Sequence, residues 1–181
     1  MTPLDRLMRW RSEASTTEKL YGAIVAQARL PVFYRSFGIP DTLQGRFTLL
    51  ALHLFAVLHR LQSEDLEGSA LAQELVDRFS QDMDTVLREL GVGDLRVPKA
   101  MRHLAAASKG LFQDYEVALA AGEGAVTHAI AASLPGETQS PEVSSGALAS
   151  YLLASIDALA REDIASLRAG ALEFPEASIK P

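Results

Sequence analysis

Residues 47–58 read FTLLALHLFAVL and place apolar side chains on nearly every face of a helix, with only Thr48 and His53 as exceptions. As a helix these residues span about 18 Å, which is too short for a bilayer core of about 30 Å. A helix that is apolar all round is therefore expected at the centre of a globular domain. Asp41, with Gln44 three positions later, forms a capping-box pattern. We therefore place the central helix at residues 42–61.

The segments around this helix have helical periodicity and lack the alternation that is typical of strands. Thr16 or Thr17 is expected to cap a helix to about residue 28, and a helical turn should follow Pro31, over residues 32–37. The same periodicity predicts further helices at 69–90, 98–121, 125–134 and 148–159, with a polar loop at 135–146. A continuation of the last helix to residue 167 is the alternative. The fold class is all-α: one compact domain of about six to seven helices.

Three parts are expected along the chain. Residues 1–15 form a basic amphipathic segment with Arg6, Arg9 and Arg11, and the acidic Asp5 and Glu13 argue against a secretory signal. Residues 16–169 form the helical domain. Residues 170–181 are predicted to be a loosely held tail.

Composition removes several classes of chemistry. The 181 residues include no cysteine, so thiolate metal sites, iron–sulfur clusters, disulfides and Cys nucleophiles are excluded. Without cysteine or a signal sequence the chain is expected in the cytoplasm.

Charge is distributed unevenly. The net charge is −6, yet residues 1–60 hold eight Lys/Arg against four Asp/Glu, and seven of the twelve aromatic residues lie before residue 56. A basic, aromatic-rich third on an acidic body could face lipid headgroups, nucleic acid or an acidic partner. The alternative is an ordinary solvated surface over core aromatics. Nucleic acid is poorly supported, because phosphate binding requires a denser cluster of cations.

Motifs for catalysis are missing. His53 and His59 are six residues apart and point to different sides of one helix, so they cannot share a metal ion. The two Gly-x-Gly pairs, at residues 91–93 and 122–124, have no preceding strand or following lysine and are interpreted as helix ends. We expect no enzyme activity, cofactor or metal site, with an unrecognised site around His53 or Asp84 as a remote alternative. His53 itself is interpreted as a core histidine.

Two blocks of sequence resemble the ubiquinol–cytochrome c chaperone family. The first runs from Ala28 through RLPVFY to GIPDTLQGRF at residues 38–47. The second comprises FSQDMD at 79–84, LRELGVGDL at 87–95, and VPK at 97–99 with Met101. The blocks occur in the right order and span about residues 20–120.

This resemblance implies an all-helical assembly factor for the cytochrome bc1 complex, of a bacterial type. It implies a newly made cytochrome b, or another immature membrane subunit, as the client. It further implies a second assembly factor as partner, and peripheral contact with the inner face of the bacterial inner membrane.

The predicted contact surface joins the aromatic segment, Phe33, Tyr34 and Phe37, to the connector at residues 91–98. Packing under the central helix and helix punctuation are the alternative explanations for these residues. The candidate partner-binding residues are Arg29, Phe33, Tyr34, Phe37, Arg46, Asp82, Asp84, Arg88, Gly91, Gly93, Asp94, Pro98 and Lys99.

A second hypothesis is a peripheral membrane protein that binds lipid or quinone. Its pocket would lie between residues 21–37 and residues 47–61, and Arg29, Arg35 and Arg46 would contact anionic lipid.

Overall fold

The structure is a computed structural model that describes residues 15–62 and 66–178. Within these ranges the chain is all-α, with no strand, and it forms six longer helices and two helices of five residues each. The prediction of an all-α fold is confirmed. The helices are α2 (Thr16–Ala28), α3 (Pro31–Arg35), α4 (Leu43–Gln62), α5 (Leu66–Glu89), α6 (Val97–Ala121), α7 (Glu123–Ser133), α8 (Pro141–Arg161) and α9 (Ile164–Arg168).

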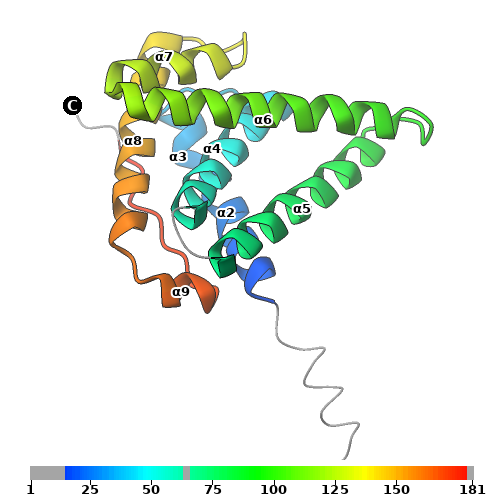
Figure 1. Cartoon of the computed structure of the whole chain (residues 1–181). Coiled ribbons are helices and arrows are strands. Elements are labelled where there is room, and N and C mark those ends of the chain that lie inside the picture. Colours follow the sequence, from blue (N-terminus) through cyan, green and yellow to red (C-terminus); the bar gives the residue numbers. More distant parts are fainter. Residues whose placement is uncertain (1–14, 63–65, 179–181) are drawn as a thin grey trace, which may run out of the picture.

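Helix α4 occupies the centre, as its sequence requires. Every residue from Thr48 to Leu58 is buried, and α2, α5 and α8 pack around the helix (Figure 1). The hydroxyl of Thr48 donates to the carbonyl of Ser133 at 3.3 Å, which also links α4 to the end of α7. Burying a leucine contributes about 1.5–3 kcal/mol, so this helix supplies a large part of the folding free energy.

The beginnings of α2 and α4 differ from the expected caps. Ser15 caps α2 by accepting from the amide of Glu18 at 3.1 Å, so the cap is not Thr16 or Thr17. The hydroxyl of Thr42 accepts from the amide of Gly45 at 3.2 Å, whereas Asp41 binds Arg46. The capping box was therefore the wrong interpretation, because the Asp41 carboxylate has a charged partner one turn into the helix.

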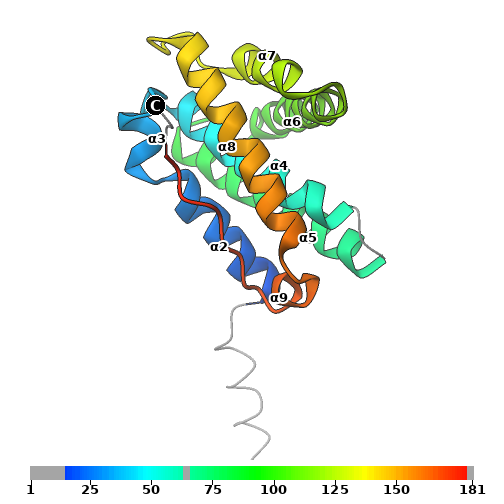
Figure 2. The ribbon, with the colours of Figure 1, turned by 90° about the vertical axis from the view of Figure 1, so that its left-hand side faces the viewer.

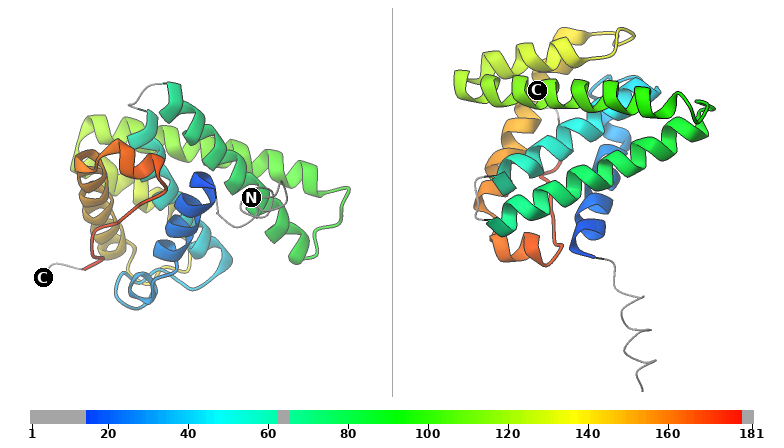
Figure 3. Two further views of the ribbon diagram at one scale, coloured as in Figure 1. Left: turned by 90° about the horizontal axis from the view of Figure 1, so that it is seen from below. Right: turned by 45° about the vertical axis from the view of Figure 1, so that its right-hand side comes forward.

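The last part of α5 and the first part of α6 form an arm that projects beyond the other helices and ends in a tight tip, whereas the rest of both helices packs on the domain (Figures 1 and 3). Gly91 ends α5 with φ +79°; its amide donates to Arg88 and the amide of Val92 to Leu87, as in a Schellman motif. Pro98 lies in the first turn of α6. The apolar stripe of α5 is buried as far as Phe79, but Leu90 at its end is 57% exposed.

The C-terminal third contains more helix than expected. Helix α8 begins at Pro141, inside the predicted loop, because proline and the acidic residue after it suit a first turn. Helix α8 ends at Arg161, and Asp163 caps the separate α9 by accepting from the amide of Ala165 at 3.0 Å. The predicted helix at 148–159 is thus part of α8, and its alternative continuation to residue 167 is wrong, because a break at residues 162–163 separates α9.

Residues 171–178 have no regular secondary structure and run beside α2 (Figure 2). Leu172 and Phe174 pack against the core, and Ala177 is buried. These residues are thus held against the domain rather than loosely, because their apolar side chains cover the core. The predicted basic amphipathic segment at 1–15 lies, except for Ser15, outside the described residues.

One helix of the described residues, α8, is long and apolar enough to cross a membrane by length and composition. In this structure α8 packs against α4 and α7, and Leu148, Leu152 and Leu159 on its inner face are buried. The helix therefore serves here as part of the core.

We predict that Gly45→Ala destabilises the fold by about 2 kcal/mol or more. A Cβ at residue 45 would lie 2.0 Å from the carbonyl oxygen of Pro40, a backbone atom that cannot rotate away. Urea unfolding followed by circular dichroism measures the change. The matched control is Gly110→Ala on α6, where a Cβ meets nothing within 4 Å. There alanine should raise the free energy of unfolding by as much as about 1 kcal/mol, because it is the better helix former. Equal stability of the two variants would contradict the assigned close approach.

Candidate functional site

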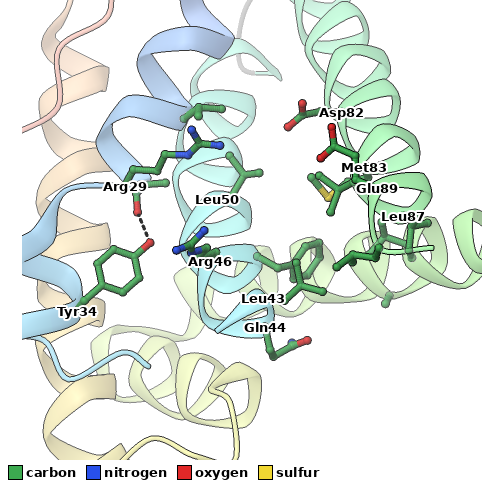
Figure 4. Close-up of a pocket in the computed structure, with 17 residues that line it drawn as sticks. Arg29, Tyr34, Leu43, Gln44, Arg46, Leu50, Asp82, Met83, Leu87 and Glu89 are labelled. Carbon is green, nitrogen blue, oxygen red and sulfur yellow. Dashed lines mark hydrogen bonds between the residues drawn. The ribbon is translucent and has the colours of Figure 1, made fainter. Parts of the chain in front are cut away.

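A groove of about 490 Å³ lies between the α2–α4 side of the domain and the α5–α6 arm. Its lining is mostly apolar and comes from five helices, α2 to α6, with Arg29 and Leu90 just after the ends of α2 and α5 (Figure 4). The apolar residues are Val25, Leu43, Phe47, Leu50, Met83, Val86, Leu87, Leu90, Leu104 and Ala107, together with Ala28. The arm therefore forms one wall of a trough whose interior excludes charge.

Charged residues stand on opposite rims of the groove. Arg29 and Arg46 lie on the α2–α4 side, while Asp82 and Glu89 lie on α5 (Figure 4). The rims therefore carry opposite charges, so an occupant with charges at its edges would be oriented by the groove.

Tyr34 lies beside the two arginines. Its hydroxyl donates to the carbonyl of Ala28 at 3.1 Å, which ties α3 to the end of α2. Burial raises the pKa of Tyr34, with a further contribution from the charge of Asp41, so the phenol stays protonated at neutral pH.

Arg46 is held by an ion pair at the surface. Its Nε donates to the Asp41 carboxylate at 2.7 Å, and this hydrogen bond lowers the pKa of Asp41. Because both groups are exposed, the pair contributes little to stability and mainly fixes where the guanidinium lies.

Asp82 also has a structural partner. The hydroxyl of Tyr21 on α2 donates to the Asp82 carboxylate at 2.9 Å. Arg78 lies 4.8 Å above the centre of the Tyr21 ring and donates to Glu18 at 3.0 Å. Burial raises the pKa of Tyr21, so the hydroxyl remains a donor. This polar contact fixes the angle between α2 and the arm, and with it the width of the groove.

Two of the predicted contact residues are in the core instead. Phe33 and Phe37 are buried, with ring centroids 5.1 Å apart, and each packs edge-on against Tyr151. They cannot present a surface to a partner. Helix α3 is too short for its periodicity to show which face is buried. Only the tertiary structure shows that Tyr151 of α8 covers these two rings.

Seven predicted residues gather at the arm tip. Arg88 bridges Asp84 and Asp94, with nitrogen–oxygen distances of 2.6 Å to each carboxylate. Its hydrogen bond lowers the pKa of Asp84. The other residues of this group are Gly91, Gly93, Pro98 and Lys99, which shape the turn into α6 or flank it. These seven residues do not line the groove, whereas four other predicted residues do: Arg29, Tyr34, Arg46 and Asp82.

The apolar wall of the groove was not predicted from the sequence. Met83, Val86 and Leu87 on α5 form part of this wall. The pocket predicted from the sequence lay between residues 21–37 and 47–61, and that prediction did not include α5 and α6, which form the second wall. The length of α5 is the feature that could have indicated this wall. Its 24 residues exceed the 20 of α4, so one end of α5 must extend beyond the core.

His53 lies in the core, fully buried, and its ring is satisfied on both sides. Nδ1 lies 2.7 Å from the carbonyl of Leu49, and Nε2 lies 3.1 Å from the Tyr151 hydroxyl. Gln27 donates to that hydroxyl at 2.9 Å, and the Phe174 ring packs edge-on at 5.1 Å. Burial lowers the pKa of His53 to about 4, so the ring is neutral. The prediction of a core histidine is confirmed.

The described residues contain no group of three or more His, Asp or Glu side chains that could hold a metal ion. Asp84, the other position considered for catalysis, is at the arm tip in an ion pair with Arg88.

The model of the family described as ubiquinol–cytochrome C chaperone matches residues 35–174. The chain is similar to a crystal structure of the Cbp3 homolog from Brucella abortus, with a TM-score of 0.80 and 35% sequence identity. That match covers 96% of this chain and 97% of the other chain. Among curated proteins there is no match.

We predict that His53 makes the fold sensitive to mild acid. The pKa of His53 is about 4 in the folded protein, whereas the ordinary value of 6.5 applies to the unfolded chain. Between these two pH values the unfolded chain therefore binds a proton that the folded chain does not. The free energy of unfolding should therefore fall by about 1 kcal/mol per pH unit as the pH drops from about 6.5 to 4. Urea unfolding at several pH values measures this slope.

His53→Gln should flatten this slope, whereas the matched control His103→Gln, at an exposed position on α6, should leave it unchanged. Should His53→Gln fail to fold, NMR titration of the unmodified protein provides the test. A His53 ring that becomes protonated near pH 6.5 would contradict the assigned burial.

Proposed function

We propose that this chain, which belongs to the ubiquinol–cytochrome C chaperone family, is an assembly chaperone that holds newly made cytochrome b in the groove between α2–α4 and the arm. The family indicated by the two sequence blocks is confirmed, and with it a role in assembly of the cytochrome bc1 complex. The client and its binding place are the parts that we propose.

The observation that carries the proposal is the apolar floor of the groove. Phe47, Leu50 and Met83 contribute to it from helices on opposite sides, in a trough open to solvent. An isolated apolar segment of a membrane protein needs such a surface, because its side chains would otherwise be exposed to water. Helix-in-groove binding uses the same physics as the core: apolar side chains spaced along one helix face enter a groove between other helices.

The role needs no catalytic group, and we propose that the protein is not an enzyme. Binding by burial and charge matching accounts for the features of the groove, including Arg29 and Glu89 on opposite rims. No cofactor is required for this binding.

The arm tip is the place that we propose for a second assembly factor. Asp84, Arg88 and Asp94 form a charged surface there, held together by two ion pairs. Such a surface is suited to fixing the orientation of a soluble partner, while the groove is left for the client.

Lipid or quinone in the same groove is the alternative function. The apolar floor together with Arg29 and Arg46 on one rim would also accommodate an apolar molecule with a polar head. We favour the protein client because the groove is an open trough with charged groups on both rims.

We also propose that the protein acts at the inner face of the bacterial inner membrane, in peripheral contact with lipid.

We predict that Leu87→Glu lowers the recovery of cytochrome b about tenfold when tagged protein is pulled down from detergent-solubilised membranes of its host. Leu87 is half-buried in the groove wall, and a carboxylate there would be desolvated against an apolar occupant. Quantitative mass spectrometry measures the recovery.

The matched control is Val117→Glu, which adds the same charge at a site on α6 that is 70% exposed and outside the groove lining. It should leave recovery unchanged, and circular dichroism checks that both variants fold. Lipid or quinone recovered without cytochrome b would overturn the proposal, as would equal recovery with both variants.

A further inference from the structure

Four cations lie along the exposed side of α6 near the arm tip. They are Arg96, Lys99, Arg102 and Lys109, which we call the α6 basic stripe. All four side chains are exposed, and none forms an ion pair with a described residue. By contrast, Arg46, Arg78, Arg88 and Arg161 are each paired with a carboxylate.

Helical spacing places the stripe on one face. At about 100° per residue, positions 99, 102 and 109 fall within an arc of about 80° on α6, and Arg96 is the residue just before the helix. No Asp or Glu occurs between residues 95 and 113. Leu104 and Ala107, which line the groove, lie on the other side of α6. The helix therefore has a groove face and a cationic face.

The acidic residue nearest the stripe in sequence, Asp94, is already paired. Its carboxylate accepts from Arg88 at 2.6 Å, and Arg88 also holds Asp84 on the other side. The negative charge of Asp94 is thus partly neutralised by Arg88, so it does little to reduce the positive potential of the stripe.

An apolar side chain extends the same face at the tip. Leu95 is 98% exposed and lies four residues before Lys99, and the turn at residues 93–97 leads into α6 through a hydrogen bond from the amide of Val97 to Gly93. A nearly fully exposed leucine beside unpaired cations is the pattern by which peripheral proteins bind the boundary between headgroups and acyl chains.

We propose that the α6 basic stripe and Leu95 form the surface by which this protein binds anionic lipid membranes. The cations contact phosphate headgroups along about 20 Å of helix, and Leu95 enters the interface at the tip. This inference rests on the membrane contact in the proposed function, and it assigns that contact to α6 rather than to the basic N-terminal third.

The exposed leucine favours a membrane over nucleic acid as the anionic partner. A nucleic acid would give Leu95 no apolar environment, and the net charge of −6 opposes a long polyanion that extends past the stripe. A flat membrane needs to meet only one face. With the stripe on the lipid, α6 lies between the bilayer and the groove, which places the groove about one helix diameter from the membrane surface.

Vesicle flotation tests the surface with the full chain. The probe is phosphatidylcholine vesicles with about a quarter phosphatidylglycerol, compared with phosphatidylcholine alone. The variant Lys99→Gln/Arg102→Gln/Lys109→Gln should reduce the vesicle-bound fraction at least fivefold on anionic vesicles. Leu95→Ser should reduce the vesicle-bound fraction less than the triple variant does, and this apolar loss should not depend on salt. Binding through the stripe is electrostatic, so the vesicle-bound fraction of the unmodified chain should fall as salt is raised.

The matched control is Lys19→Gln/Arg35→Gln/Arg161→Gln, which changes the net charge equally at exposed positions away from α6. It should bind vesicles nearly as well as the unmodified chain. Every variant keeps residues 1–14, so differences among them report the stripe and not Arg6, Arg9 or Arg11.

Equal loss with both triple variants would overturn the proposal, as would binding that is independent of phosphatidylglycerol. Loss of single-stranded RNA binding in the stripe variant, with vesicle binding unchanged, would assign the surface to nucleic acid instead. Pull-down of cytochrome b from detergent, where no bilayer is present, should not change in the stripe variant. This separates failure of the lipid surface from failure of the client groove.

Discussion

The structure depends on the burial of one helix on all sides. Helix α4 has no polar face from Thr48 to Leu58, so other helices must cover it completely. Helices α2, α5 and α8 provide most of that cover, and the polar groups inside are satisfied within the core, as His53 is by Leu49 and Tyr151. Because α4 fixes the positions of its neighbours, it also fixes one wall of the groove.

The arm follows from a mismatch of lengths. Helix α5 has 24 residues and α6 has 25, so both are longer than the 20-residue helix that they cover in part. Their excess projects beyond the core, closed by the turn at Gly91 (Figure 3). Apolar side chains on the projecting part, such as Met83 and Leu87, then face a groove instead of a packed interior. The contact of Tyr21 with Asp82 holds the arm at its angle.

Charge is divided between the two helices of this arm. Helix α5 carries the acidic rim and Asp84, which Arg88 binds, whereas α6 carries cations with no carboxylate partner among the described residues. An apolar groove on one side of α6 and a cationic face on the other would let one helix serve a membrane-protein client and the membrane itself. The net charge of −6 conceals this division, because it averages surfaces that face different directions.

The sequence by itself determined the helical fold, the central helix and the family, because these depend on local periodicity and on patterns within one segment. The ends of helices were less predictable: Asp41 resembled a cap until Arg46 was placed beside it. Only the tertiary structure decided which apolar residues were core and which were groove. Phe33 and Leu87 both lie on apolar helix faces, and α8 covers Phe33 while no described helix covers the groove. Burial is a property of neighbours that are distant in sequence, so the pattern of a single helix cannot reveal it.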